Sequence, residues 1–223
     1  MTITHHPSDA TLIAYGAGGL PERPALVVAT HVSLCRICRE KLRDVDALGG
    51  VLLELLPPSE MATDAFACVM ARLGEPDAPP VRTLEARRPS PTRGGMATPE
   101  PLRRYLGGDI KDVRWRALLP GIRYVEVMPR TPDGGNVMLL RVAPGMALGL
   151  HGHRGSEQTV ILAGTYSDAF GRFGAGDFCE TDETVTHQPI ADLDEDCICL
   201  ICTEAPLRYD GWLARMLQPF LRI

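Results

Sequence analysis

The chain has 223 residues, of which 45% are hydrophobic, 23% are charged and only 5% are aromatic. This composition is ordinary for a globular protein, and its core is expected to be built mainly from aliphatic side chains. The net charge of −5 lacks the basic surplus that nucleic-acid binding requires, so a protein partner or a small ligand fits better than DNA or RNA. No apolar run approaches the ~20 residues that span a bilayer, and the first residues lack the order of a signal peptide. We therefore expect a cytoplasmic protein without membrane contact.

The amino-terminal third is predicted to be helical. Ser8 and Asp9 are good helix caps, Pro24 suits a first helical turn, and Pro57 with Pro58 stops a helix. The helices predicted from these signals and from the apolar spacing span residues 8–17, 25–35, 41–56 and 63–73. We assign residues 1–75 to one small helical domain.

A change of composition follows this helical third. Seven of the chain's 19 prolines fall between residues 74 and 101, where large apolar residues are almost absent. Such a segment cannot bury enough surface to offset the entropy lost on ordering it. We therefore predict a Pro-rich linker over residues 76–109, acting as a mobile, extended tether.

The remaining sequence, residues 110–223, has the two-residue period of short strands. Strands are predicted at residues 122–127, 137–142, 159–162 and 197–202, separated by turns rich in Gly, Pro and Asp. Many short strands at regular spacing indicate a sandwich or barrel. Residues 212–221 are predicted to be a helix or a covering tail. The fold class is thus α + β in two domains, a small helical bundle followed by an antiparallel β-barrel.

A first set of candidate metal ligands lies in the helical part. Seven cysteines, an odd number, in a chain expected to be cytoplasmic indicate thiols and metal ligands rather than disulfides. His31, Cys35 and Cys38 have helical spacing, and Cys38 can reach the same point if the helix breaks near residue 36. Structural zinc takes four such ligands in a tetrahedron. We choose His6 as the fourth ligand, with His5 as the near alternative and Cys68 as a distant one.

A second set of candidate ligands lies among the predicted strands. His151 and His153 project to one face of a strand, and Glu157 follows after a tight bend. His187 is the only histidine that remains, so it is the choice for the fourth ligand. Three imidazoles and one carboxylate suit a divalent metal, whether zinc, iron, manganese or nickel, and leave room for an exogenous ligand. A small oxidised molecule inside the barrel is one such ligand.

The spacing Gly145-x5-His151-x-His153-x3-Glu157-x6-Gly164 matches the first cupin motif without a gap. The second cupin motif is met only loosely, through Gly171 and Gly176, and this places His187 with less support than the other three ligands. The resemblance covers roughly residues 110–205. It implies a small antiparallel barrel with the metal inside.

The order of the two parts carries a further resemblance. The helical unit resembles the zinc-binding anti-sigma domain, and a cupin joined after it resembles the ChrR anti-sigma factors; the runs at residues 1–9 and 27–35 fit that family closely. The resemblance implies that the helical domain wraps an extracytoplasmic-function sigma factor and hides its polymerase-binding surface. It also implies that the cupin is needed for the response to singlet oxygen or organic hydroperoxides.

Two alternatives stay open at this point. A cupin metal held by three histidines and a glutamate also occurs in enzymes, so a dioxygenase or isomerase with a helical accessory domain is the rival interpretation. Cys197 and Cys199 face the same side of a predicted strand, so a redox role is conceivable for them. Packing is the competing interpretation of both cysteines, because buried cysteine is a common small core residue.

Overall fold

The computed structural model describes residues 2–73 and 97–209 of the chain. The helices of this part, in chain order, are α1 (Asp9–Gly16), α2 (Glu22–Leu34), α3 (Arg36–Glu54), α4 (Ala65–Arg72), α5 (Glu100–Leu106) and the short 3-10 helix η1 (Ile110–Asp112). The four predicted helices of the amino-terminal third are therefore present. The third begins earlier than predicted, at Arg36, because the chain leaves α2 and enters α3 with only Cys35 between them.

Twelve strands form the β-domain (residues 116–209). They are β1 (Arg116–Leu119), β2 (Ile122–Met128), β3 (Asn136–Val142), β4 (His151–Gly152), β5 (Glu157–Ala163), β6 (Thr165–Asp168), β7 (Gly171–Gly174), β8 (Phe178–Thr181), β9 (Thr186–His187), β10 (Ile190–Ala191), β11 (Cys197–Thr203) and β12 (Arg208–Tyr209). The largest sheet has the order β1-β2-β3-β11-β5-β8, and the smaller ones have the orders β10-β6-β7 and β12-β4-β9. All pairings are antiparallel, as predicted, and the three sheets surround a common interior.

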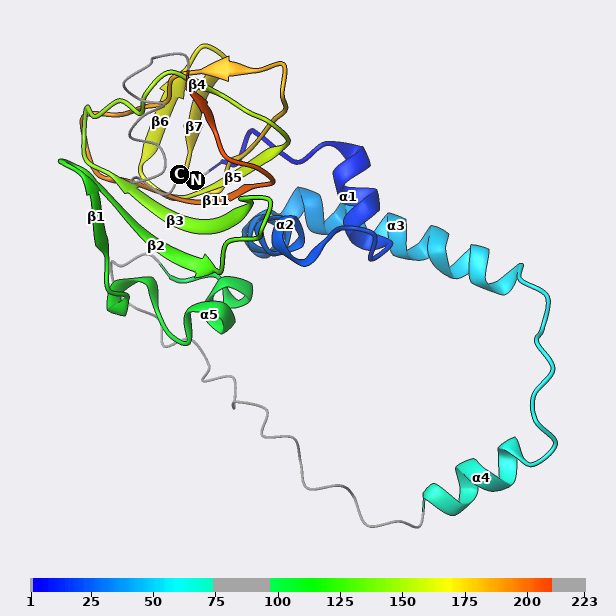
Figure 1. The fold of residues 1–223 in the computed structure, drawn as a ribbon. Coiled ribbons are helices and arrows are strands. Elements are labelled where there is room, and N and C mark those ends of the chain that lie inside the picture. Colours follow the sequence, from blue (N-terminus) through cyan, green and yellow to red (C-terminus); the bar gives the residue numbers. More distant parts are fainter. Residues whose placement is uncertain (1, 74–96, 210–223) are drawn as a thin grey trace.

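The central strands β3, β11 and β5 of the six-stranded sheet are buried on both faces, and each face packs against a different layer. Alternate residues such as Leu140 and Cys199 face the interior shared with the smaller sheets. The residues between them, such as Leu139 and Leu200, face outward into a core that also contains Val27 of α2. Helix α2 accordingly lies against β5 and β11 (Figure 1). The amino-terminal helices and the β-domain thus share one hydrophobic core.

Part of the predicted linker is ordered. Residues 97–109 include α5, whose Leu102 is fully buried, and α5 packs against α2 and β2 (Figure 1). Pro101 is tolerated because it lies in the first turn of the helix, where no backbone N–H partner is needed. The linker prediction is wrong for residues 97–109. The apolar side chains of Leu102, Leu106 and Ile110 pack into or against the core, and this burial orders the segment. The rest of the predicted linker, and the predicted helix at 212–221, lie outside the described residues.

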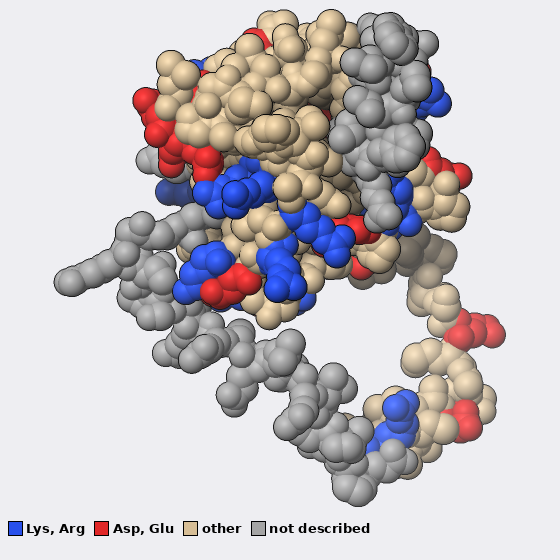
Figure 2. Space-filling view, turned by 60° about the vertical axis from the view of Figure 1, so that its left-hand side comes forward, with Lys and Arg blue, Asp and Glu red and all other residues tan. Residues whose placement is uncertain are grey.

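Among the residues that the structure describes, no helix combines the length and the apolar character needed to cross a membrane. The described basic side chains on the face shown in Figure 2 are interrupted by acidic ones. That face therefore lacks the continuous basic surface typical of nucleic-acid binding.

Two candidate metal centres

The break between α2 and α3 gathers the first set of ligands, here called the helix cluster (His6, His31, Cys35 and Cys38). His31 lies in the last turn of α2, and Cys38 lies in the first turn of α3. Cys35 between them adopts an extended backbone, with φ −96° and ψ 114°. This single extended residue turns α3 so that Cys38 faces the same point as His31. His6 approaches from the segment before α1.

The distances within the helix cluster fit a tetrahedral metal site. The Nε2 atom of His31 lies 3.2 Å from the Cys38 sulfur, and the Nδ1 atom of His6 lies 3.4 Å from the sulfurs of both Cys35 and Cys38. In a tetrahedron with Zn–S of about 2.3 Å and Zn–N of about 2.0 Å, nitrogen and sulfur ligands lie about 3.5 Å apart. The four ligand atoms therefore surround a space of the size that a zinc ion requires.

Burial acts in opposite ways on the histidine and the cysteine ligands of the helix cluster. His31 is fully buried, and this burial lowers its pKa to about 4, so its imidazole is neutral at pH 7. Its Nδ1–H donates to the carbonyl of Gly176 at 2.8 Å, which leaves Nε2 free to bind a metal. Burial also raises the pKa of Cys38 to about 12. A bound divalent cation would offset the free-energy cost of ionising this buried thiol, because a thiol that coordinates a metal is deprotonated.

The structure brings His6, and neither alternative, into the helix cluster. His5 points instead toward the β-domain, where its Nδ1 lies 3.3 Å from a carboxylate oxygen of Asp177 and its ring contacts Phe173. Cys68 is exposed on α4.

The second set of ligands, here called the sheet cluster (His151, His153, Glu157 and His187), comes together inside the β-domain. All four side chains are buried, and one ligand atom from each lies within 4.8 Å of the others. His187 joins the cluster because β9 pairs with β4, which sets it directly opposite His151. Their Nε2 atoms lie 3.1 Å apart. The loosely matched second motif therefore does deliver a histidine to this place.

Neighbouring groups orient the imidazoles of the sheet cluster. The Nδ1–H of His151 donates to the Gly149 carbonyl at 2.7 Å, and the Nδ1–H of His187 donates to Asp168 at 2.9 Å. The Nδ1 atom of His153 is buried and has no hydrogen-bond partner among the described residues. An orphaned buried nitrogen that faces a carboxylate and two further imidazoles is the arrangement that a metal ion satisfies.

Burial also sets the charges of the sheet cluster. It lowers the pKa values of His151 and His153 to about 4 and raises the pKa of Glu157 to about 7. The two imidazoles are therefore neutral at pH 7, the form that binds metal, and a metal would hold Glu157 ionised. The residues present fit a divalent cation with three nitrogen ligands and one oxygen ligand.

The last glycine of the matched cupin motif, Gly164, is required for steric reasons. Gly164 adopts φ +66°, and a Cβ atom there would lie 2.4 Å from the carbonyl oxygen of Asp196. Any other residue would push β11 away from the turn that follows β5, the strand that carries Glu157.

Cys197 and Cys199 lie on the inner face of β11, buried in the core. The hydrogen bond with the Cys197 thiol and burial raise the pKa of Cys199 well above its ordinary value. Thiols react with oxidants as thiolates, so this setting favours the packing interpretation over a redox role.

One short strand touches both clusters. At the start of β8, the Phe178 ring packs edge-on against His31 of the helix cluster, with ring centroids 5.4 Å apart. At its end, Thr181 pairs with Glu157 across the sheet, and its hydroxyl lies 3.2 Å from Nε2 of His153. Three residues of strand cover only about 10 Å. A displacement of β8 would therefore change the surroundings of both clusters.

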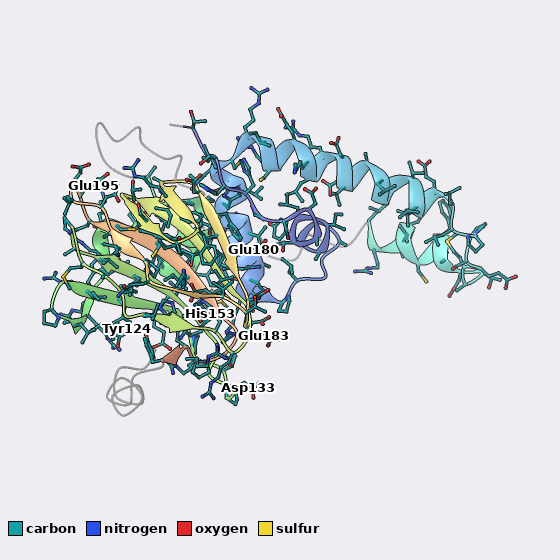
Figure 3. The ribbon with its side chains drawn as sticks, turned by 90° about the horizontal axis from the view of Figure 1, so that it is seen from above. Tyr124, Asp133, His153, Glu180, Glu183 and Glu195 are labelled. Atoms are coloured by element: carbon teal, nitrogen blue, oxygen red, sulfur yellow. The ribbon has the colours of Figure 1, made fainter. Side chains whose placement is uncertain are left out.

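The turn before β8 holds the amino-terminal segment that delivers His6. Asp177 accepts backbone N–H bonds from Thr4, His5 and Gly174 at 2.7, 3.0 and 2.9 Å. Burial alone would raise the pKa of Asp177, but these N–H groups outweigh it and hold the pKa below its ordinary value. Next to it, Glu180 of β8 accepts hydrogen bonds from the start of α1, on the side of the β-domain that faces the helices (Figure 3).

Asp177→Ala is expected to lower the free energy of unfolding by about 3 kcal/mol, because three N–H groups lose a charged acceptor. Urea denaturation followed by circular dichroism measures this change. Asp194→Ala, which removes a carboxylate from an exposed turn, is the matched control and should change stability by less than about 0.5 kcal/mol. Equal stability of the two variants would contradict this role of Asp177.

Three residues that support the ligands were not predicted from the sequence: Asp168 on β6, Asp177 in the turn before β8, and Thr181 on β8. These residues lack a local signal, because each acts across a long sequence separation, as from Asp177 to Thr4.

The fold and the two clusters define a class of protein: a helical unit with one candidate metal centre, packed onto a cupin-type β-domain with a second candidate centre inside. A family model described as the ChrR Cupin-like domain matches residues 104–206. The chain is 44% identical, over 226 residues and the full length of both proteins, to the Anti-sigma-E factor ChrR of Cereibacter sphaeroides. The solved structure of Rhodobacter sphaeroides SigE in complex with the anti-sigma ChrR matches with a TM-score of 0.73 and 41% identity, over 91% of this chain and 100% of that one.

This chain belongs to the ChrR family of anti-sigma factors. The family resemblance inferred from the sequence is confirmed, and so is the α + β fold class with a cupin-type domain. The chain is accordingly a regulator, and the rival interpretation as a cupin dioxygenase or isomerase is not supported.

Proposed function

We propose that this protein sequesters an extracytoplasmic-function sigma factor through its helical unit, residues 1–75, and releases it under oxidative stress, with the cupin domain of residues 110–223 needed for the response. Singlet oxygen and organic hydroperoxides are the proposed stresses. Because a sigma factor acts on RNA polymerase, the proposed location is the cytoplasm. The observation that carries the proposal is an uncovered apolar surface on α3 and α4.

This surface, here called the α3–α4 surface, consists of large apolar side chains that are each at least 51% exposed. Its members are Leu48, Val51, Leu52, Leu53, Leu55, Leu56, Phe66, Val69, Met70 and Leu73. Contiguous exposed apolar side chains mark protein interaction sites, since a soluble chain seldom leaves them in water. The outer part of α3 projects from the rest of the molecule, and α4 stands apart from the β-domain (Figure 1). A partner can therefore insert between or around these helices.

We assign zinc to the helix cluster, because two thiolates and two imidazoles in a closed tetrahedron are a common structural zinc set. The ion would join the segment before α1, the end of α2 and the start of α3, and so would fix the direction in which α3 projects. For the sheet cluster we propose a divalent metal, zinc or alternatively iron, manganese or nickel. Its role there would be to offer a coordination position to an exogenous ligand.

The path of the signal is proposed to run through β8. A sigma factor can be released only if the signal lowers the affinity of the helical unit for it. Thr181 touches His153 in the sheet cluster, and Phe178 in the same strand touches His31 in the helix cluster. A change around His153 thereby reaches the α2–α3 break within one strand.

Leu52→Asp is expected to weaken sigma-factor binding at least tenfold, because a buried carboxylate would replace an apolar contact. Affinity is measured by surface plasmon resonance with an extracytoplasmic-function sigma factor from the same organism as the partner. Leu193→Asp is the matched control, because Leu193 is equally apolar and 82% exposed but lies on the β-domain. The control should bind normally, and equal loss in both variants would contradict the assignment of the α3–α4 surface.

A further inference from the structure

The three sheets enclose a cavity of about 350 Å³ beside the sheet cluster. Its walls come from the inner faces of β3 and β11 and from the smaller sheets, and they include His151, Glu157 and His187. This volume lies at the lower end of the range of about 300–1,000 Å³ that small-molecule sites occupy.

The cavity is polar at one end and apolar at the other, and the strand register produces this gradient. Glu157, Thr203 and Asn136 lie side by side across β5, β11 and β3 and form a polar row at the metal-binding end. Further along the same strands the lining residues become Met138 and Ile201, then Leu140 and Cys199, then Val142 and Cys197. From Asn136 to Val142 the strand covers about 20 Å, enough for an extended acyl chain of medium length.

Asn136 supplies a second, independent indication of a ligand. Its side chain is only 5% exposed and lines the cavity, and its Oδ1 atom has no hydrogen-bond partner among the described residues. A buried amide oxygen without a partner is costly, so native proteins rarely keep one unless something else satisfies it. The O–H of a hydroperoxide would satisfy this oxygen, and so would the O–H of a carboxylic acid that binds in its protonated form.

The charge at this end favours an oxygen acid. Arg208 of β12 lies directly opposite Gly152 of β4, the residue between His151 and His153. A divalent ion held by three neutral imidazoles and one carboxylate would retain one positive charge. Both features attract an acidic head group and repel a cationic one.

We propose that this cavity binds a single-chain amphiphile of the fatty-acid class, with the acid or hydroperoxide head group at the polar row and the hydrocarbon chain along β3 and β11. The proposal rests on the proposed function, because it names the class of molecule that the cupin domain recognises. The polar row sets the specificity for the head group, and the apolar walls set the length of the chain that fits.

Isothermal titration of the metal-loaded full chain with decanoate tests the proposal. Decanoate is expected to bind, decylamine to show no binding, and methyl decanoate to bind at least tenfold more weakly than the acid. Asn136→Leu, which removes the amide, and Leu118→Trp, which fills the apolar end, should each weaken decanoate binding at least tenfold. Leu193→Ala, outside the cavity, is the control and should bind normally.

No binding of decanoate to the parent at about 1 mM would overturn the proposal, and so would normal affinity in both cavity variants. Metal content and melting temperature are measured on each variant, so that a misfolded protein is recognised. If one cavity variant misfolds, the other still decides the result. Sigma-factor binding is measured on the same preparations. A chain that binds its sigma factor but not decanoate would contradict the proposed ligand alone. A chain that binds decanoate but no sigma factor would contradict the proposed function.

Discussion

Cys38→Ser should reduce the metal bound by the full-length chain from two ions to one and weaken sigma-factor binding at least a hundredfold. The expectation follows from the position of Cys38, which is fully buried and lies within reach of both His6 and His31. Inductively coupled plasma mass spectrometry gives the metal content, and surface plasmon resonance gives the affinity. The remaining ion should be the one in the sheet cluster.

The size of this effect reflects what a metal in the helix cluster holds together. Structural zinc contributes on the order of 10 kcal/mol to the folding of small zinc domains. In this chain α2 has a second support, because its buried face packs against β5 and β11. Helix α3 packs mainly on α1 and α2. The loss of zinc should therefore free α3, and the α3–α4 surface with it, before it unfolds α2.

Cys68→Ser is the matched control for this experiment. Cys68 is also a cysteine of the helical unit, but it is exposed on α4 and outside the cluster. The control should keep two metal ions and full affinity. A Cys38→Ser protein that still carried two ions would contradict the assignment of the helix cluster as a metal site.

The helix cluster was largely predictable from the sequence because most of its geometry is local. His31, Cys35 and Cys38 lie within eight residues, and their convergence requires a helix break, which occurs at Cys35. The sequence alone does not distinguish His5 from His6 as the fourth ligand, since adjacent residues differ only in the direction in which their side chains point. In the structure His5 contacts Asp177 of the β-domain and His6 lies in the cluster, and the contact of His5 has no signature in sequence spacing.

The shared core was not predicted, although one signal for it exists. The run from Ala25 to Ala29 is apolar on every side of the helix, and Leu26, Val27 and Val28 are all buried. A helix that is apolar all round must be covered on more than one side, which a small bundle alone cannot provide. A linker was predicted between the two parts instead, because composition indicates which segments lack core residues but not which element a neighbouring helix packs against.

The double variant His151→Ala/His153→Ala should hold its sigma factor normally but fail to release it under oxidant, with induction of the target genes at least tenfold lower than in the parent. Two of the four ligands would be gone, and Glu157 and His187 alone are too few to hold a divalent metal. The helix cluster keeps all its ligands, so affinity for the sigma factor and one zinc ion per chain should remain. A reporter gene and metal analysis measure both outcomes, and normal release by a folded double variant would contradict the sensing role.

Thr181→Val tests whether the signal passes through β8 while all the proposed metal ligands are still present. Valine has nearly the volume of threonine but cannot accept the Nε2–H of His153, and Thr181 is not one of the four ligands. This variant should keep two metal ions and still respond more weakly to oxidant than the parent. Thr184→Val, at an exposed turn after β8, is the control and should respond normally. If Thr181→Val also responds normally, the signal does not pass through β8, even though the metal ligands remain necessary for it.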